Sequence, residues 1–235
     1  MKIGYNWLNI IQKNLLPPIC ILCGHAGMDD LDLCDSCYRH LPSNHHCCWQ
    51  CAETLEITTP TKSLCGRCVS LKPAFDRTYA PFLHQGVPRY LITSLKFSAN
   101  YKNARLLGNL LGDYLQKHAE LPDVIIPIPL HKSRYRERGF NQSIEIARTI
   151  AKQLKLPLDV ESCIRHRDTQ HQTSLTAKER RHNIKNAFSL IKPITARHIA
   201  VVDDVMTTGS TVHELAAVLK NFGVKRVDVW ACARA

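Results

Sequence analysis

Two adjacent carboxylates followed by a run of hydroxyl side chains are the residues of this chain best suited to chemistry. Asp203 and Asp204 come directly after the apolar run 199–202, and the segment Met206-Thr207-Thr208-Gly209-Ser210-Thr211 follows after Val205. Carboxylates accept hydrogen bonds from sugar hydroxyls, whereas hydroxyl side chains and the backbone N–H groups at a helix start bind an anion. The pattern therefore predicts a site for a phosphate joined to a vicinal diol, as in a ribose 5-phosphate.

A strand and a helix must hold these residues in place. The run 199–202 is short and rich in β-branched residues, which is typical of a buried strand. Val212, Leu215, Ala216 and Leu219 recur at helical spacing within 212–222, so the hydroxyl segment becomes the loop that enters a helix. An ordinary strand-to-helix turn with a capping Ser or Thr accounts for one hydroxyl but not for the whole pattern. A retained fold that has lost catalysis remains an open alternative.

The cysteines predict a second kind of chemistry, metal binding. Eight of the eleven cysteines form four Cys-x-x-Cys pairs: Cys20/Cys23, Cys34/Cys37, Cys48/Cys51 and Cys65/Cys68. Two-residue spacing lets both sulfurs of a pair face one metal, and four thiolates complete a tetrahedral Zn²⁺ shell, so two structural zinc sites are expected.

The spacing leaves the details of these sites open. Sequential and interleaved pairing give the same ligand count, and Cys47, His45 or His46 could replace a ligand. A disulfide framework is the competing interpretation, and the missing signal-peptide pattern disfavours it. The segment is also too short to build a core without a staple, which favours a structural role for the zinc.

A cation-rich segment lies between the cysteines and the acid pair. Lys132, Arg134, Arg136 and Arg138 follow a predicted strand that runs into a proline-stiffened loop at 124–129, and a helix is expected over 143–154. Arginine suits bidentate contacts with phosphate oxygens, so Arg134 and Arg138 are candidates for binding a pyrophosphate. The competing interpretation is a solvated charge run. The polar stretch 165–183 is predicted to be a mobile loop that leads to a helix.

The remaining pattern predicts an α/β fold with a largely parallel sheet flanked by helices. Helical spacing marks 87–97 and 104–118, and strands are expected at 78–83, as an edge, and at 225–231. We expect a module of residues 1–72, beginning with a short amphipathic helix, and a second domain of residues 73–235. No run approaches the roughly 20 apolar residues of a membrane helix, so no membrane insertion is expected. The net charge of +11 is compatible with a polyanionic ligand or with nucleic acid.

The order of strand, acid pair and hydroxyl loop resembles the binding motif of the type I phosphoribosyltransferases for phosphoribosyl pyrophosphate (PRPP). The resemblance implies that Asp203 and Asp204 hold the ribose and act in catalysis, and that Met206 to Thr211 hold the 5-phosphate. The stretch 165–183 is similar to the flexible catalytic loop of that family. Magnesium would accompany PRPP as a bridge between ribose and pyrophosphate oxygens, because it prefers oxygen ligands.

Four features in this order resemble the ComF family, also called ComFC or GntX-like proteins. They are the Cys-x-x-Cys module, Lys96-Phe97, the segment Arg138-Gly139-Phe140-Asn141-Gln142 and the Asp203 motif. The resemblance covers nearly the whole chain and implies a double zinc ribbon followed by a phosphoribosyltransferase-like domain. It further implies a cytoplasmic bacterial protein that acts in natural competence and transformation, with single-stranded DNA and competence proteins as partners.

Two classes of function fit these expectations. In the first, the protein is a transferase in which an acceptor displaces pyrophosphate from PRPP; no residue pattern names the acceptor. In the second, it is a non-catalytic adaptor whose zinc ribbon binds DNA or a protein, with PRPP as a sensor ligand or absent. Trp49 could stack on a base in such an adaptor, or pack over the metal site.

Overall fold

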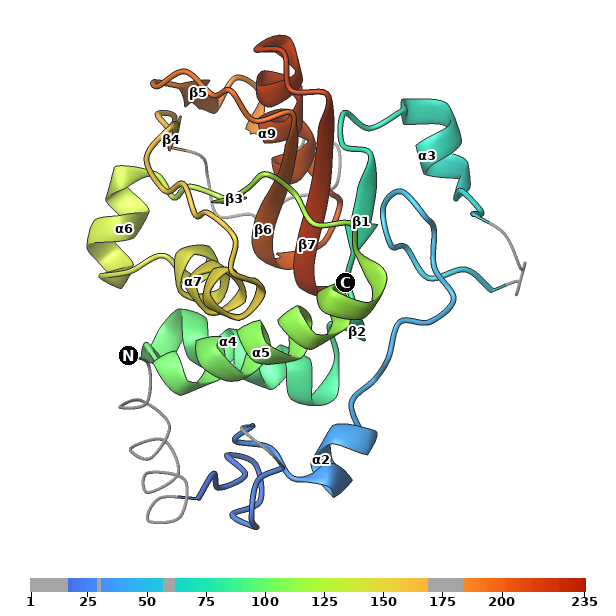
Figure 1. Ribbon diagram of the computed structural model, residues 1–235, viewed down its shortest axis with the longest axis vertical. Coiled ribbons are helices and arrows are strands. Elements are labelled where there is room, and N and C mark those ends of the chain that lie inside the picture. The colour runs from blue at the N-terminus through green and yellow to red at the C-terminus, as the bar shows by residue number, and fades with distance from the viewer. Residues whose placement is uncertain (1–16, 29–30, 57–61, 169–183) are drawn as a thin grey trace, which may run out of the picture. The chain divides into compact units, whose positions relative to one another are not determined.

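The computed structural model describes residues 17–28, 31–56, 62–168 and 184–235 (Figure 1). The chain divides into two compact units, Met1–Leu41 and Pro42–Ala235. This division falls before the second pair of cysteine knuckles rather than at residue 72, because Cys48, Cys51 and Cys68 belong to the same hydrophobic core as the sheet. The amphipathic helix expected near the N-terminus lies outside the described residues.

The smaller unit contains the helix α2 (Asp35–Arg39). In the larger unit, helices and strands follow one another in the order typical of α/β proteins, and their bounds are α3 (Gly66–Leu71), β1 (Arg77–Tyr79), β2 (Phe82–Leu83), α4 (Gly86–Ser98), α5 (Tyr101–His118), β3 (Val124–Pro127), α6 (Lys132–Arg138), α7 (Gln142–Leu154), β4 (Cys163–Arg165), β5 (Phe188–Leu190), β6 (His198–Met206), α9 (Ser210–Asn221) and β7 (Arg226–Arg234).

The main sheet is parallel, with the strand order β1-β7-β6-β3 and with β2 also paired to β7. Strands β4 and β5 form a separate antiparallel pair. The first two strands lie at the edge, as expected from Pro81, which has no N–H to donate to a ladder. The α/β prediction with a largely parallel sheet is therefore confirmed.

Helices cover both faces of this sheet, as Figure 1 shows for α9 on one side and for α5 and α7 on the other. The apolar face of α9 shares one core with alternate residues of the central strands, Ile199, Val201, Val227 and Val229. Because successive side chains of a strand point to opposite faces, the intervening residues Ala200, Val202 and Trp230 are buried on the other face. Both faces of β7 are therefore covered, and the alternation of valines along it does not mark one exposed face.

Two elements differ from the sequence expectation. The cation-rich segment, to which the sequence assigned no helix or strand, is the helix α6, whose His131 cap accepts a hydrogen bond from the Ser133 N–H and whose end is set by left-handed Gly139. Strand β6 also continues through the acid pair, because its pairing with β7 extends to Met206 opposite Arg234. Among the described residues, no helix is long and apolar enough to cross a membrane.

Candidate functional site

The acid pair lies near the carboxyl end of β6, where ligands bind in open parallel sheets. Asp204 is 2% exposed, and its Oδ2 atom is 2.6 Å from the Lys96 Nζ atom at the end of α4. The Oδ1 atom of Asp203 accepts hydrogen bonds from the Ser143 hydroxyl at 3.1 Å and from the Asp204 N–H at 2.9 Å. Two helices on one side of the sheet thus hold the carboxylates in defined positions.

The pKa of Asp203 is shifted by its surroundings, which include the neighbouring Asp204 carboxylate. Burial and the neighbouring Asp204 charge raise the pKa of Asp203 to about 7, while the Lys96 ammonium opposes this shift. A carboxyl with a pKa near neutrality is common in functional sites, because like charges at short range resist joint ionisation. Burial and the neighbouring carboxylate therefore favour the protonated form of Asp203 more than water would.

The hydroxyl segment forms the turn between β6 and α9. Gly209 is the N-cap of α9 with φ of 76°, a conformation that glycine adopts without steric cost. A Cβ atom at this position would lie 2.7 Å from the Met206 Cε atom, so only glycine fits without rearrangement. The Thr208 and Ser210 hydroxyls are 2.8 Å apart, and the start of the 12-residue helix α9 follows directly. Residues 206–211 are called the phosphate loop below.

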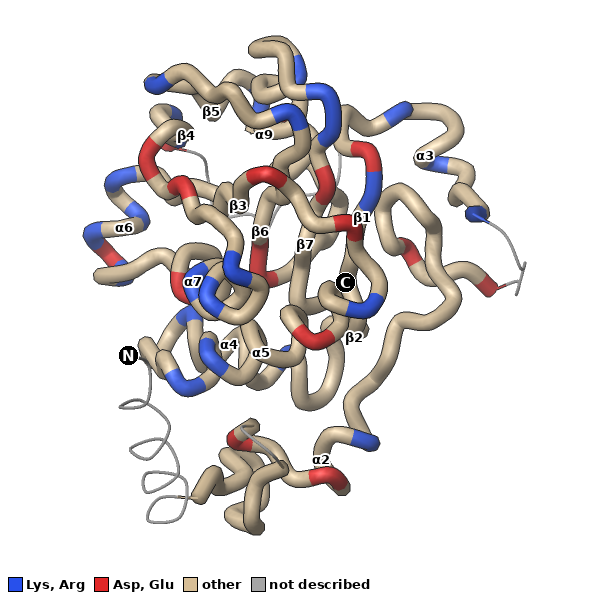
Figure 2. The backbone as a smooth tube through the Cα atoms, in the orientation of Figure 1, with Lys and Arg blue, Asp and Glu red and all other residues tan. Residues whose placement is uncertain are grey.

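The two arginines predicted to bind pyrophosphate lie on α6, where four of seven residues are cationic (Figure 2). Arg138 Nη1 donates to Gln142 Oε1 at 2.6 Å, and burial lowers the pKa of Arg138, with the Asp204 charge opposing. Burial and the Arg134 charge lower the pKa of Arg165, with Asp203 opposing. The charges of the acid pair therefore act on Arg138 and Arg165. The predicted catalytic loop lies mostly in 169–183, outside the described residues.

Sequence reasoning did not assign Lys96 and Ser143 to the site. Lys96 lies in the last turn of α4, next to the buried residues Leu91, Ile92 and Leu95. A cation beside a buried helix face is a signal that could have identified Lys96 as a site residue. Ser143 follows the Asn141 cap of α7, whose side chain accepts from the Ser143 N–H at 2.9 Å. Nothing local in the sequence shows that the Ser143 hydroxyl reaches Asp203, 60 residues further along the chain.

The eight knuckle cysteines form two clusters with sequential pairing. The sulfurs of Cys20, Cys23, Cys34 and Cys37 form one cluster and those of Cys48, Cys51, Cys65 and Cys68 the other, each set lying within 4.8 Å. Cys47 belongs to neither, and no disulfide is formed by the cysteines, all of which are described and free.

Both clusters fit Zn²⁺. A Zn–S bond of about 2.3 Å implies sulfurs about 3.8 Å apart in a tetrahedron, and Cys23–Cys34 and Cys51–Cys65 are each separated by 3.6 Å. A hydrogen bond with Cys51 lowers the pKa of Cys48 to about 4 against the effect of burial, so this cluster offers a thiolate at neutral pH. Bound zinc would supply folding energy through a closed shell, with no open position for a substrate.

Trp49, within the second cluster, has cations over its ring. The Arg77 guanidinium lies 3.4 Å and the Lys62 ammonium 4.7 Å from the ring centroid. A cation–π contact of this kind stabilises the ribbon against β1 and leaves less of the ring for stacking on a base.

Comparison with known families assigns both halves of the chain. Residues 11–69 match the double zinc ribbon domain, and residues 140–234 match the phosphoribosyl transferase domain. The two cysteine clusters lie in the first match, and the acid pair with the phosphate loop lies in the second. The chain is therefore a double zinc ribbon joined to a phosphoribosyltransferase fold.

Similar curated proteins extend over nearly the full length. The DNA utilization protein YhgH of Escherichia coli O157:H7 is 38% identical over 93% of this chain and 98% of that protein. Competence protein F of Haemophilus influenzae is 33% identical over 92% of this chain and 96% of that protein. Competence protein ComFC of Streptococcus pneumoniae is 24% identical over 92% of this chain and 99% of that protein. The chain belongs to the ComF family, which the sequence motifs predicted.

Proposed function

We propose that this protein binds Mg²⁺–PRPP at the end of β6 and that it serves the use of incoming DNA. The acid pair next to a glycine-capped phosphate loop carries this proposal, because it combines acceptors for a diol with donors for a phosphate in one turn. The phosphoribosyl transferase match over residues 140–234 supports it. The names of the relatives, which refer to competence and DNA utilization, support a role in the use of DNA. A cytoplasmic location and partnership with single-stranded DNA and competence proteins are part of the same proposal.

Different residues of the site would bind different groups of PRPP. The phosphate loop would bind the 5-phosphate through its N–H groups and hydroxyls, and Asp203 and Asp204 would accept hydrogen bonds from the ribose hydroxyls. Magnesium prefers oxygen ligands, so it would enter with PRPP and would neutralise part of the negative charge of the pyrophosphate. Arg134 and Arg138 of α6 would face the pyrophosphate, since arginine pairs with phosphate oxygens in a bidentate manner.

If an acceptor reacts at this site, the carboxylates have a further role. Positive charge develops on the ribose ring as pyrophosphate departs, and fixed anions nearby stabilise that charge. Lys96 limits this effect in the free protein, because its ammonium neutralises Asp204 at 2.6 Å. Binding of the diol must therefore share or displace the Lys96 contact.

The first test is the substitution Asp204→Asn. We expect PRPP affinity in the presence of Mg²⁺ to fall by about tenfold to a hundredfold, because a hydrogen bond to a charged group contributes about 1.5–3 kcal/mol. Titration calorimetry measures the affinity. Asp35→Asn is the matched control, because Asp35 is an exposed member of an ion pair in the other compact unit.

Both outcomes of this titration are informative. Unchanged affinity in Asp204→Asn would remove Asp204 from the site. A folded, zinc-loaded wild-type protein that binds no PRPP would contradict the proposal as a whole, and the protein would then act as a non-catalytic adaptor for DNA or a protein partner.

The proposal also predicts a pH dependence. Binding of the diol requires ionised carboxylates, and the pKa of Asp203 is raised to about 7. The protonated fraction therefore grows as the pH falls through 7, and the dissociation constant should rise by about tenfold between about pH 8 and pH 6. PRPP itself titrates in this range, so the comparison is with Asp203→Asn, which should bind more weakly at pH 8 but show a flatter profile. Parallel profiles for the two proteins would contradict the assignment.

A further inference from the structure

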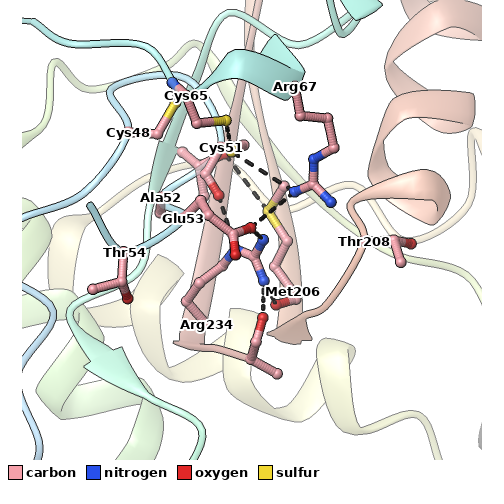
Figure 3. A network of polar contacts seen from close by, with 12 residues as sticks. Cys48, Cys51, Ala52, Glu53, Thr54, Cys65, Arg67, Met206, Thr208 and Arg234 are labelled. Carbon is pink, nitrogen blue, oxygen red and sulfur yellow. Dashed lines mark hydrogen bonds and ion pairs between the residues drawn. The ribbon is translucent and has the colours of Figure 1, made fainter. Parts of the chain in front are cut away.

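A buried arginine connects the second zinc cluster to the phosphate loop (Figure 3). Arg234, at the end of β7, is 3% exposed. Its Nε atom donates to the Cys51 carbonyl at 3.0 Å, and its Nη1 atom donates to the Met206 carbonyl at 3.1 Å and to the Ala235 carbonyl. Its Nη2 atom forms an ion pair with Glu53. One guanidinium thus contacts the second cysteine knuckle and the first residue of the phosphate loop.

Such an arrangement restricts both partners. An ionised side chain is buried at a large desolvation cost, which is offset only when its donors are matched by acceptors in good geometry. The guanidinium is planar and rigid, so its Nε and Nη1 atoms hold the Cys51 and Met206 carbonyls at a fixed separation. A shift of either backbone segment would leave a buried donor unpaired.

On the ribbon side, the network reaches the metal ligands. Glu53 also pairs with Arg67 at 3.0 Å, and Arg67 Nη2 lies 3.9 Å from the Cys51 sulfur. Zinc bound to four thiolates would leave the cluster with a net charge of −2, and outer-shell cations stabilise such a charge. A loaded cluster would therefore hold Arg67, Glu53 and Arg234 in their present positions more firmly than an empty one.

On the loop side, Met206 is held from several directions. Its carbonyl also accepts from the Ala235 N–H at 3.0 Å, and its methyl group would touch any side chain placed at Gly209. Cys51, Arg67 and Cys68 share the lining of one cavity of about 310 Å³ with Thr208, Gly209 and Ser210. The ribbon and the loop thus face each other within a single compact unit.

We propose that the second zinc cluster and the phosphate loop are energetically coupled, with Arg234 as the positioning residue between them. Zinc at Cys48, Cys51, Cys65 and Cys68 favours the loop geometry that binds the phosphate, and a bound phosphate ligand retains that zinc. Linkage requires this reciprocity, and coupling free energies of this kind correspond to about 5- to 150-fold. The identity of the ligand as PRPP rests on the proposed function, whereas the coupling does not.

The first experiment follows zinc release from the full-length, zinc-loaded protein into a chromogenic chelator. The variant Cys20→Ser, Cys23→Ser removes the first site, so release reports on the second. We expect saturating Mg²⁺–PRPP to slow this release at least fivefold. In the converse variant, Cys48→Ser, the remaining first site should release zinc at the same rate with and without PRPP. PRPP that binds by calorimetry but leaves release from the second site unchanged would overturn the coupling.

The second experiment removes the connection itself. Arg234→Lys keeps the charge but cannot reach both carbonyls, so it should retain two zinc ions and lose the effect of PRPP on zinc release. Arg226→Met is the control, because Arg226 is also an ion-paired arginine of β7 but at the opposite end of that strand. Persistence of the full effect in Arg234→Lys would overturn the role of Arg234. If Arg234→Lys does not fold, Arg67→Met should weaken the effect in the same direction.

A third measurement separates the coupling from the proposed function. Hydrogen exchange of the amides of residues 207–211 is compared between the zinc-loaded protein and protein from which the second zinc has been removed by chelation. We expect at least fivefold faster exchange in the loop after removal, with residues 144–150 of α7 unchanged. Should wild-type protein bind no PRPP, the proposed function fails, while this result still decides the coupling. Equal exchange in both forms would overturn it.

Discussion

Replacing both Cys48 and Cys51 by serine is expected to lower the thermal stability of the unit Pro42–Ala235 strongly, whereas replacing Cys20 and Cys23 should leave the stability of that unit unchanged. The reason is the position of the second cluster. Cys48, Cys51 and Cys68 are at most 2% exposed and belong to the same core as α9 and the central strands. Structural zinc contributes folding energy directly, so loss of this zinc removes part of the stability of the unit, while the sheet and its helices keep a buried core of their own.

The two variants differ only in which cluster they disrupt, and each serves as the control for the other. Far-ultraviolet circular dichroism and thermal unfolding report the state of the larger unit, and metal analysis reports zinc content. Each variant should lose one of the two zinc ions. A Cys48→Ser, Cys51→Ser protein with the wild-type thermal transition would show that the second zinc does not stabilise the larger unit.

The sequence predicted those parts of the fold in which local pattern and tertiary position agree. The acid pair and the phosphate loop are contiguous in the chain, so a single segment revealed the strand, the turn and the helix. The zinc pairs were equally clear, since two-residue spacing is a local property. Their grouping was not, because sequential and interleaved pairing differ only in the path of the chain between knuckles.

The remaining features depend on contacts between distant residues. The sequence holds no local signal that Arg234 is buried, because its partners Glu53 and Cys51 are more than 180 residues away along the chain. The sequence did not predict the α6 helix, because charges dominate its composition, while its caps, His131 and Gly139, are set by side-chain and backbone geometry. The division of the chain at Leu41 likewise depends on how the second ribbon packs on the sheet.

Substitution of Lys96 by methionine is expected to lower the free energy of unfolding by about 3 kcal/mol, the lower end for breaking a buried ion pair. The effect arises because Asp204 is 2% exposed and would retain a charge with no cation 2.6 Å away. Adding Asp204→Asn to Lys96→Met should restore part of the free energy of unfolding, because it removes the unpaired negative charge of Asp204. Lys192→Met is the control, because Lys192 pairs with Glu161 at the surface, where both side chains are more than half exposed. That change should cost less than about 1 kcal/mol.

The same substitution tests the link between this ion pair and ligand binding. Lys96 lowers the pKa of Asp203 against the effects of burial and Asp204, so its removal should move that pKa above 7. If PRPP binds only when Asp203 is ionised, the midpoint of the pH dependence of PRPP affinity must move to higher pH in Lys96→Met. Thermal unfolding and calorimetric titrations across the pH range measure both effects in one protein. A destabilised variant with an unshifted midpoint would show that Lys96 stabilises the fold without setting the charge of the acid pair.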